Sequence, residues 1–299
     1  MIKFKSGELN LLVQSGKFVD EQSREFIKGA LGLKKKKVEA KRHTILSGPP
    51  GVGKTYGTQD ECNKGKVKYI KIDPGTSDIN QTVKLACAVY SLKNDEELVV
   101  LLDDADDVVF GSYESLNKWK IAMADTDYEQ GIIPMYTHSV SMTSMLQTLE
   151  KQAVLDPSKY QIIKALKHFM PADSLGVSIP TDRVRFIVLC NLDLEDAKAF
   201  RSAKMRSAVT PVLDRMQYKR INVDWEKQWG WTAYVLGETQ PFDNYKLAVS
   251  QKVELMNWMY SNWDKLRSTS YRTVRVLAAA MINEPDSYID EWKNELKGH

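Results

Sequence analysis

Residues 44–58 read TILSGPPGVGKTYGT, and this stretch decides how the rest of the chain is interpreted. A β-rich run enters it, and Gly48, Gly53, Lys54 and Thr55 then fill the pattern G-x-x-x-x-G-K-[ST]. Glycines let backbone N–H groups curl around a phosphate, because they adopt the required dihedral angles at low cost. The lysine would neutralise β- and γ-phosphate oxygens, the threonine hydroxyl would bind Mg²⁺, and a following helix would add the positive end of its dipole. The stretch therefore predicts a site for ATP and Mg²⁺. The expected ligands of the nucleotide in this loop are Gly48, Pro49, Pro50, Gly51, Val52, Gly53, Lys54, Thr55 and Tyr56.

The segments after residue 43 alternate between short apolar runs and amphipathic stretches, which is typical of an α/β domain with a parallel sheet covered by helices on both faces. The expected strands are HTILSG, VKYIKID, ELVVLLDD, VRFIVLCN and YKRINV. After residue 223 the strand pattern stops, and four segments with helical spacing follow. The predicted fold class is a phosphate-loop NTPase sheet sandwiched by helices, followed by a small all-helical lid. The expected divisions are 1–42 (a helical segment and basic linker), 43–223 (the core, with an insertion at about 127–180) and 224–299 (the lid).

Bulk composition limits the class of protein. Hydrophobic residues make up 43% and charged residues 27% of the 299 residues, as in ordinary globular proteins. The N-terminus MIKFKSGELN lacks the apolar core of a secretory signal, no apolar run is long enough to span a bilayer, and the three cysteines are scattered. We therefore expect a cytoplasmic protein with reduced cysteines and no membrane partner. A net charge of +3 does not indicate nucleic acid by itself, and the basic run KKKKVEAKR at 34–42 fits either a phosphate-backbone contact or a solvated linker.

A second polar cluster follows the apolar run at 98–102, where the sequence reads LVVLLDDADD. Two adjacent carboxylates at a strand end are costly unless a cation or solvent compensates them. Asp103 is expected to hold Mg²⁺ through water, and Asp104 to orient the water that attacks the phosphate. Asp106 and Asp107 are interpreted as helix-capping acids, and the alternative is that they also take part in the chemistry of this site.

The order of these motifs resembles that of the AAA+ ATPases. In that family a polar residue closes a further strand and senses the γ-phosphate, and FIVLCN matches it with Asn191. VTPVLDRM resembles the short helix that ends in an arginine finger, which implies Arg215, although a surface arginine paired with Asp214 is the alternative. STSYRTVRVL resembles the sensor helix of the lid, with Arg272 at the matching position and Arg275 as the second choice. The alternative is that Arg272 is an arginine on the exposed face of that helix.

The chain is also similar to AAA+ proteins of large tailed bacteriophages, through DDADDV, SLN and YRTV. More distantly, it resembles the ring motors that drive Holliday-junction branch migration. The resemblance covers about residues 43–282 and implies a homo-oligomeric, hexameric ring, located in the host cytoplasm if the protein is phage-encoded.

One position departs from the family pattern, since AAA+ motors usually carry Glu where this chain has Asp104. The shorter side chain loses roughly 1.5 Å of reach, and a misplacement near 1 Å can cost about 10²-fold in rate. Either hydrolysis is slow, or an adjustment of the backbone restores the geometry.

The insertion carries its own pattern. GIIPMYTHSVSM and GVSIPTDRV are expected to pair as a hairpin, with two helices between them. Lys151, Lys159, Lys164 and Lys167 would give these helices a basic face, and the alternative is a peripheral packing element. The tryptophans of the C-terminal part, including Trp229 and Trp231, are expected to pack in a core rather than to stack on bases.

Together these features predict a magnesium-dependent AAA+ ATPase that remodels or moves along nucleic acid as an oligomeric ring. Lys54, Asp104, Asn191 and a neighbour's Arg215 are its expected catalytic residues, and Thr55 and Asp103 are its expected metal ligands. The expected partners are further copies of the chain, DNA, and a replication or recombination protein. The alternatives are an ATP-gated loader or scaffold with little hydrolysis, a protein-remodelling chaperone, and a small-molecule kinase.

Overall fold

The computed structural model describes residues 6–32, 42–73, 77–123, 125–126, 129–130, 132–135, 139–170, 177–200, 202–238, 245–262, 264–266 and 271–296. The chain divides into two compact units. The first, here called the loop unit, comprises Met1–Ile27, Gly48–Thr58 and Ile221–His299, and the second, the sheet unit, comprises Lys28–Ser47 and Gln59–Arg220. None of the helices in the described ranges is both long and apolar enough to cross a membrane.

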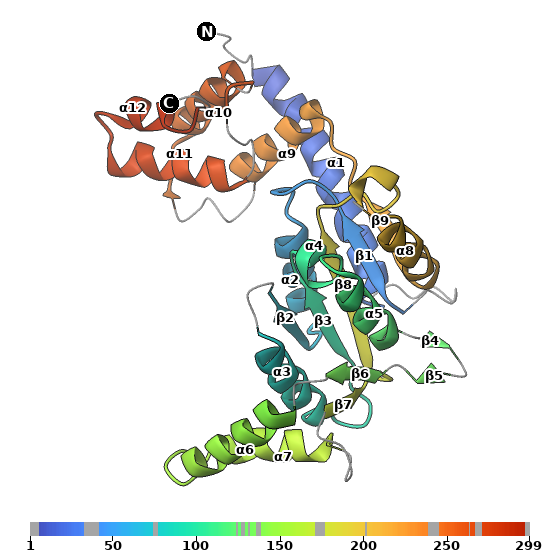
Figure 1. Ribbon diagram of the computed structural model, residues 1–299. Coiled ribbons are helices and arrows are strands. Elements are labelled where there is room, and N and C mark those ends of the chain that lie inside the picture. Colours follow the sequence, from blue (N-terminus) through green and yellow to red (C-terminus); the bar gives the residue numbers. More distant parts are fainter. Residues whose placement is uncertain are drawn as a thin grey trace. The chain divides into compact units, whose positions relative to one another are not determined.

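The sheet unit is built on a five-stranded parallel sheet with the strand order β2-β3-β8-β1-β9 (Figure 1). All five strands predicted from the sequence are confirmed. Their bounds are β1 Thr44–Ser47, β2 Tyr69–Ile72, β3 Leu98–Leu102, β8 Val184–Cys190 and β9 Gln217–Arg220. Every residue of β1 and β3 is buried, as expected for central strands that are covered on both faces.

Helices flank the sheet, so the predicted α/β class with a helix-covered parallel sheet is confirmed (Figure 1). The helices of this unit are the C-terminal end of α1 (Ser6–Ala30), the C-terminal part of α2 (Lys54–Lys64), and then α3 Asp78–Tyr90, α4 Ala105–Val108, α5 Tyr113–Ala122, α6 Ser139–Ala153, α7 Lys159–His168, the short 3₁₀ helix η1 Ala197–Ala199, and α8 Ala203–Arg215. Apolar side chains from these helices meet the sheet; the ring of Trp119 on α5, for example, lies 5.8 Å from that of Phe186 on β8.

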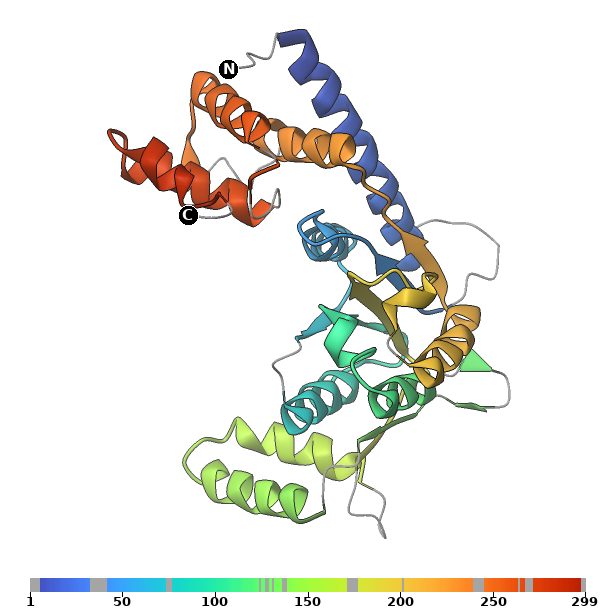
Figure 2. The same cartoon turned by 45° about the horizontal axis from the view of Figure 1, so that its top comes forward.

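The insertion forms the predicted hairpin. β6 (Ile132–Met135) pairs antiparallel with β7 (Val177–Pro180), and α6 and α7 lie between them in the chain. A second small pair joins β4 (Asp125–Thr126) to β5 (Glu129–Gln130). α6 and α7 pack against each other, and α7 also contacts α3 (Figure 2).

The C-terminal part of the loop unit is helical, which confirms the predicted end of strand structure. Its helices are α9 Trp225–Glu238, α10 Val249–Ser261, α11 Tyr271–Asn283 and α12 Tyr288–Lys293. Indole rings hold them together, since Trp292 donates Nε1–H to the carbonyl oxygen of Leu277 at 2.7 Å and its ring lies 5.1 Å from that of Trp258. Trp229 and Trp231 are buried, as predicted for core tryptophans.

α1 and α9 approach each other very closely in the loop unit. A Cβ atom added at Gly16 would lie 2.0 Å from the carbonyl oxygen of Gly230, so only glycine allows this backbone contact. The predicted divisions at 42/43 and 223/224 remain predictions, and most of the basic run at 34–42 lies outside the described residues.

Candidate functional site

The loop that follows β1 in the chain has the backbone that its glycines predict. Gly51 and Gly53 have φ angles of 83° and 77°, in the left-handed region where a side chain is strained. α2 begins directly after them at Lys54, with the amide of Gly57 bonded to the carbonyl oxygen of Gly53 at 2.7 Å. The loop therefore runs into the N-terminus of a helix of 11 residues, the end that attracts anions.

The side chain of Lys54 lies within this loop. It is only 9% exposed, and its Nζ donates hydrogen bonds to the carbonyl oxygens of Gly48 at 2.6 Å and Pro49 at 2.9 Å. The Lys54 ammonium therefore lies against the backbone of the loop, where its positive charge would attract a bound anion.

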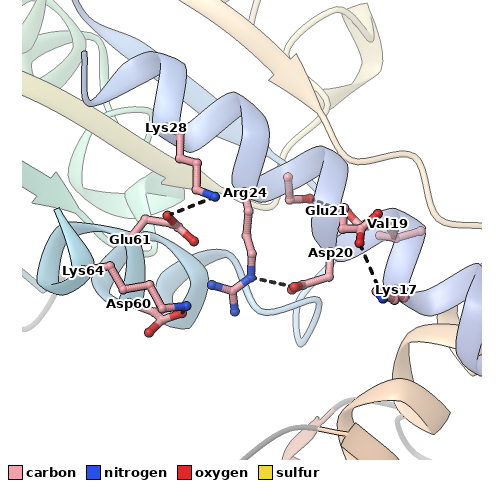
Figure 3. A network of polar contacts seen from close by, with 10 residues as sticks. Lys17, Val19, Asp20, Glu21, Arg24, Lys28, Asp60, Glu61 and Lys64 are labelled. Atoms are coloured by element: carbon pink, nitrogen blue, oxygen red, sulfur yellow. Dashed lines mark hydrogen bonds and ion pairs between the residues drawn. The ribbon is translucent and has the colours of Figure 1, made fainter. Parts of the chain in front are cut away.

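The remaining predicted ligands of the loop are arranged around its entrance to α2. Thr55 is half-buried and Tyr56 is 46% exposed, whereas Val52 is buried. The guanidinium carbon of Arg24 on α1 lies 6.0 Å from the centre of the Tyr56 ring, and Asp20 holds the same guanidinium at 2.6 Å (Figure 3). Pro50 is exposed.

The loop glycines also permit close packing, which the motif alone did not predict. A Cβ atom at Gly53 would lie 2.9 Å from Cζ2 of Trp231 on α9, and one at Gly48 would lie 3.0 Å from Cβ of Ile221. The glycines of the predicted phosphate loop therefore also fit the loop against the C-terminal part of the loop unit.

In the sheet unit, polar residues follow neighbouring strands at the carboxyl edge. Asp103 follows β3 and Asn191 follows β8, and these two strands pair directly. The last residue of β1, Ser47, pairs in register with Cys190 of β8 and is followed in the chain by the loop. Ligands of open α/β sheets bind at this carboxyl edge.

The Asp103 carboxylate has a cation beside it, as its burial requires. Only 8% of the residue is exposed, and Lys71 Nζ on β2 lies 2.7 Å from Asp103 Oδ2 and 2.8 Å from Asp73 Oδ1. Burial alone would lower the pKa of Lys71, but the hydrogen bonds to the two carboxylates raise it above its usual value. A carboxylate that requires a positive partner at this point fits a Mg²⁺ ligand.

Asp104 has a backbone conformation that explains the departure from Glu. Its φ and ψ are 45° and 47°, it is exposed, and it is the N-cap residue of α4. Aspartate and asparagine tolerate this left-handed conformation far better than longer side chains do. The shorter acid therefore suits the backbone at this position.

Asp106 is bonded to Asn191, and its interpretation as a capping acid was wrong. Asp104 is the N-cap of α4, whereas Asp106 lies in the first turn and faces the end of β8. Its carboxylate accepts hydrogen bonds from Asn191 Nδ2 at 2.7 Å, from the Asn191 amide at 2.9 Å and from the Leu192 amide at 3.1 Å. Asn191 thus has a fixed amide plane, with one N–H of its side chain directed at Asp106.

The short helix that carries Asp106 is itself well anchored. The Trp119 indole N–H donates to the carbonyl oxygen of Val108 at 3.1 Å, and Ala105 is fully buried. A Cβ atom at Gly111 would lie 2.4 Å from the Asp107 carbonyl oxygen, so the turn after α4 requires glycine. Asp106 therefore projects from a rigid element.

Two further contacts at this edge were not predicted. Arg220, the last residue of β9, forms an ion pair with Asp193, and the Ser47 hydroxyl donates to the carbonyl oxygen of Leu192. Both stabilise the segment after β8 that holds Asn191. No sequence motif marked Arg220, and none joined Asp106 to Asn191, because these partners are distant in the chain.

Arg215 lies at the end of the sheet opposite to Asp103 and Asp104 of its own chain. It is the last residue of α8, two residues before β9 begins, at the amino edge of the parallel sheet. A four-residue strand spans about 13 Å, and the carboxylates follow the opposite edge. Arg215 is half-buried, and within the described residues it forms no ion pair with Asp214.

Arg272 is exposed in the first turn of α11, in the loop unit. Arg275, on the same helix, approaches the Tyr245 hydroxyl at 3.4 Å. The predicted loop ligands and Arg272 thus belong to the loop unit, and Asp103, Asp104, Asn191 and Arg215 belong to the sheet unit.

The basic face predicted for the insertion is half neutralised. Lys167 pairs with Glu150 at 2.7 Å and Lys159 pairs with Asp156 at 3.5 Å. Lys151 and Lys164 are exposed, and the connection between the two helices presents Leu155 with 90% of its surface exposed.

Comparison of the chain with models of known protein families and with curated proteins finds no match in either set.

Proposed function

We propose that the chain is a magnesium-dependent ATPase of the AAA+ type that works as a homo-oligomeric ring, in which residues of the phosphate loop and residues that follow β3 and β8 carry out the hydrolysis. The observation that carries the proposal is the arrangement at that edge: two acids after β3 and a held asparagine after β8, beside the strand that leads into the loop. The helical segment at 224–299 then acts as the lid.

The chain's own residues divide the work of hydrolysis. Lys54 exchanges its two carbonyl partners for phosphate oxygens and neutralises their charge. Asp104 accepts a hydrogen bond from the attacking water and directs its lone pair at the γ-phosphorus, and Asn191 fixes that water from the neighbouring strand.

Thr55 and Asp103 would hold Mg²⁺. The ion pair between Lys71 and Asp103 would break when the ion binds. When bound, the ion supplies further neutralisation of charge on the phosphates.

The position of Arg215 supports action on a neighbouring subunit. Since Arg215 stands at the amino edge of its own sheet, its guanidinium would serve the site of another copy. Arginine fingers of this kind are worth about 10³ to 10⁵ in rate in other NTPases. Assembly and catalysis would then be inseparable.

Nucleic acid is the proposed substrate of the ring. The support is the insertion, a hairpin with two helices that exposes Lys151 and Lys164, which suit phosphate contacts. The pairing of Lys159 and Lys167 with acids lowers the charge available, so the contact would be local rather than extended.

Steady-state ATP hydrolysis, measured against protein concentration with and without DNA, tests the proposal. For the wild type we expect a rate per subunit that rises with concentration and is stimulated by DNA. For Arg215→Ala we expect a loss of at least about 10³-fold, with ATP binding retained.

Two other outcomes would contradict parts of the proposal. A wild-type protein that binds ATP and assembles, yet turns over negligibly under every condition, is an ATP-gated scaffold. One that binds no ATP at all has no nucleotide site.

A further inference from the structure

The indole N–H of Trp231 lacks a hydrogen-bond acceptor within the described part of the chain. Trp231 lies on α9 and is 5% exposed, and its Nε1 is fully enclosed without a partner. Buried polar hydrogens are nearly always bonded in native proteins, because leaving one unmet costs the full desolvation of the group. Such an exception requires an explanation.

The six-membered ring of Trp231, on the side next to this N–H, packs against the phosphate loop. A Cβ atom at Gly53 would lie 2.9 Å from Cζ2 and 3.7 Å from Cε2 of Trp231, and Nε1 is bonded to Cε2. Both residues belong to the loop unit. The ring that carries the unmet donor therefore packs against the loop at Gly53, the residue before α2 begins.

The position of Trp231 on α9 is fixed by its surroundings. The preceding residue, Gly230, is in backbone contact with Gly16 of α1, and Trp229 packs its ring 5.9 Å from that of Tyr260. The indole is thus held at the loop by the packing of the helix rather than by a bond of its own.

Two carbonyl oxygens of the loop, which could otherwise accept a hydrogen bond, already accept one from Lys54. Lys54 Nζ occupies those of Gly48 and Pro49. A nucleotide, by contrast, brings many acceptors: phosphate oxygens, ribose oxygens and base nitrogens.

We propose that Trp231 is a further ligand-binding residue, whose Nε1–H donates to an acceptor atom of the nucleotide held by the loop. This inference rests on the proposed function of the loop. It adds to the site a donor from α9, so that the C-terminal helical segment contacts the ligand through a neutral N–H.

A residue with this role has opposite effects on stability and on binding. In the free protein the unmet N–H costs stability, whereas in the complex it contributes affinity. Replacing Trp231 by Phe should therefore lower the affinity for the ligand. It should not cause the loss of stability that follows the removal of a hydrogen-bonded tryptophan.

The test compares Trp231→Phe with Trp229→Phe, which removes the same ring from the same helix. Calorimetric titration with ATP is expected to show a loss of roughly 3- to 30-fold for Trp231→Phe and less than about 2-fold for Trp229→Phe. Without ligand, Trp231→Phe is expected to melt no lower than Trp229→Phe.

Inorganic tripolyphosphate distinguishes the acceptors. An equal loss with tripolyphosphate assigns the acceptor to a phosphate, and a loss with ATP alone assigns it to the ribose or base. Both results support the proposal.

A measurement on the unaltered chain keeps the proposal testable if a variant fails to fold. In protein labelled with ¹⁵N-tryptophan, the Trp231 indole proton is expected to move downfield on saturation with ATP. An unmoved resonance, or equal ATP affinity in all three proteins, overturns the proposal but leaves the nucleotide site in place. Wild-type protein that binds neither ATP nor tripolyphosphate overturns the function of the loop, and with it this role for Trp231.

Discussion

The carboxylate of Asp106 satisfies three N–H groups at the end of β8, and this makes its charge state and shape important. In Asp106→Asn one oxygen becomes an NH₂ group, which cannot accept from Asn191 Nδ2. The side-chain amide of Asn191 is then expected to rotate by about 180°. Its oxygen would accept from the new NH₂ group, and its NH₂ group would point to where the oxygen was. Because a small misplacement near the reacting atoms is costly, kcat should fall about 10- to 100-fold while the Kd for ATP stays within about 2-fold.

Asp107→Asn is the matched control, since Asp107 is exposed on the same short helix. It should leave both constants unchanged. A parallel fall in kcat for both variants would show that the charge of α4, rather than the bonds of Asp106, is what matters. Hydrogen exchange of the Asn191 and Leu192 amides offers a second readout, and only Asp106 variants should speed it.

Lys71 is expected to compete with Mg²⁺ for Asp103, because its ammonium lies 2.7 Å from Oδ2 of that carboxylate. Partly exposed ion pairs contribute about 0.2–1 kcal/mol. Lys71→Gln should therefore lower the Mg²⁺ concentration for half-maximal ATP hydrolysis by about 2- to 5-fold. Lys68→Gln is the control, since Lys68 pairs with Glu96 just before β2 begins. An unchanged or higher Mg²⁺ requirement in Lys71→Gln would contradict this competition.

At the scale of elements, His43 joins three strands at the amino edge of the sheet. Its Nδ1 accepts from the Phe186 amide of β8 at 3.2 Å, and its carbonyl oxygen accepts from Gln217 of β9 at 2.9 Å. Burial, followed by the charges of Arg42 and Arg185, lowers the pKa of His43 to about 3. The folded sheet therefore requires the neutral ring.

Protonation of His43 should lower the free energy of unfolding at acidic pH. An unfolded histidine takes up a proton below about pH 6.5, whereas the folded one does so only near pH 3, so stability is present above pH 6.5 and is lost as the pH falls between these values. Between pH 7 and 5 the expected loss is about 2 kcal/mol. In denaturant titrations at the two pH values, His43→Asn should remove most of this difference, and His168→Asn, on the exposed end of α7, should keep it.

Elements were easier to predict from the sequence than their contacts. All five core strands and the paired arms of the insertion followed from apolar runs and turn residues, because burial on both faces leaves a strong pattern. The bond between Asp106 and Asn191 could not be predicted in the same way, since it joins residues 85 positions apart. For the same reason the packing of Trp231 on Gly53 left no local signal.

At the scale of the whole molecule, the proposed ring makes a prediction about mixtures. Arg215→Ala keeps its loop but lacks the finger, and Lys54→Ala keeps the finger but lacks the loop lysine. In a 1:1 mixture half of the loops and half of the fingers are intact, so about a quarter of the interfaces combine both.

Two inactive proteins should therefore regain about a quarter of the wild-type rate when mixed. ATP hydrolysis of each variant alone and of the mixture is the measurement, with subunit exchange verified by light scattering of tagged copies. If mixed rings form but stay inactive, Arg215 acts at the ATP site of its own chain or at no ATP site.

The two hydrogen bonds that Lys54 donates to the carbonyl oxygens of Gly48 and Pro49 also have a consequence in time. Nucleotide first meets a loop whose lysine is engaged, so capture should proceed in two steps, a fast encounter followed by the exchange of these bonds. In stopped-flow mixing, the observed binding rate should level off at high ATP concentration. The plateau then gives the rate constant for breaking the hydrogen bonds of Lys54 to the two carbonyl oxygens. A rate that climbs in proportion to ATP at every concentration would mean that the exchange is never limiting. If the rate does level off, the slowest step of binding is the exchange of bonds in the loop and not the diffusional encounter.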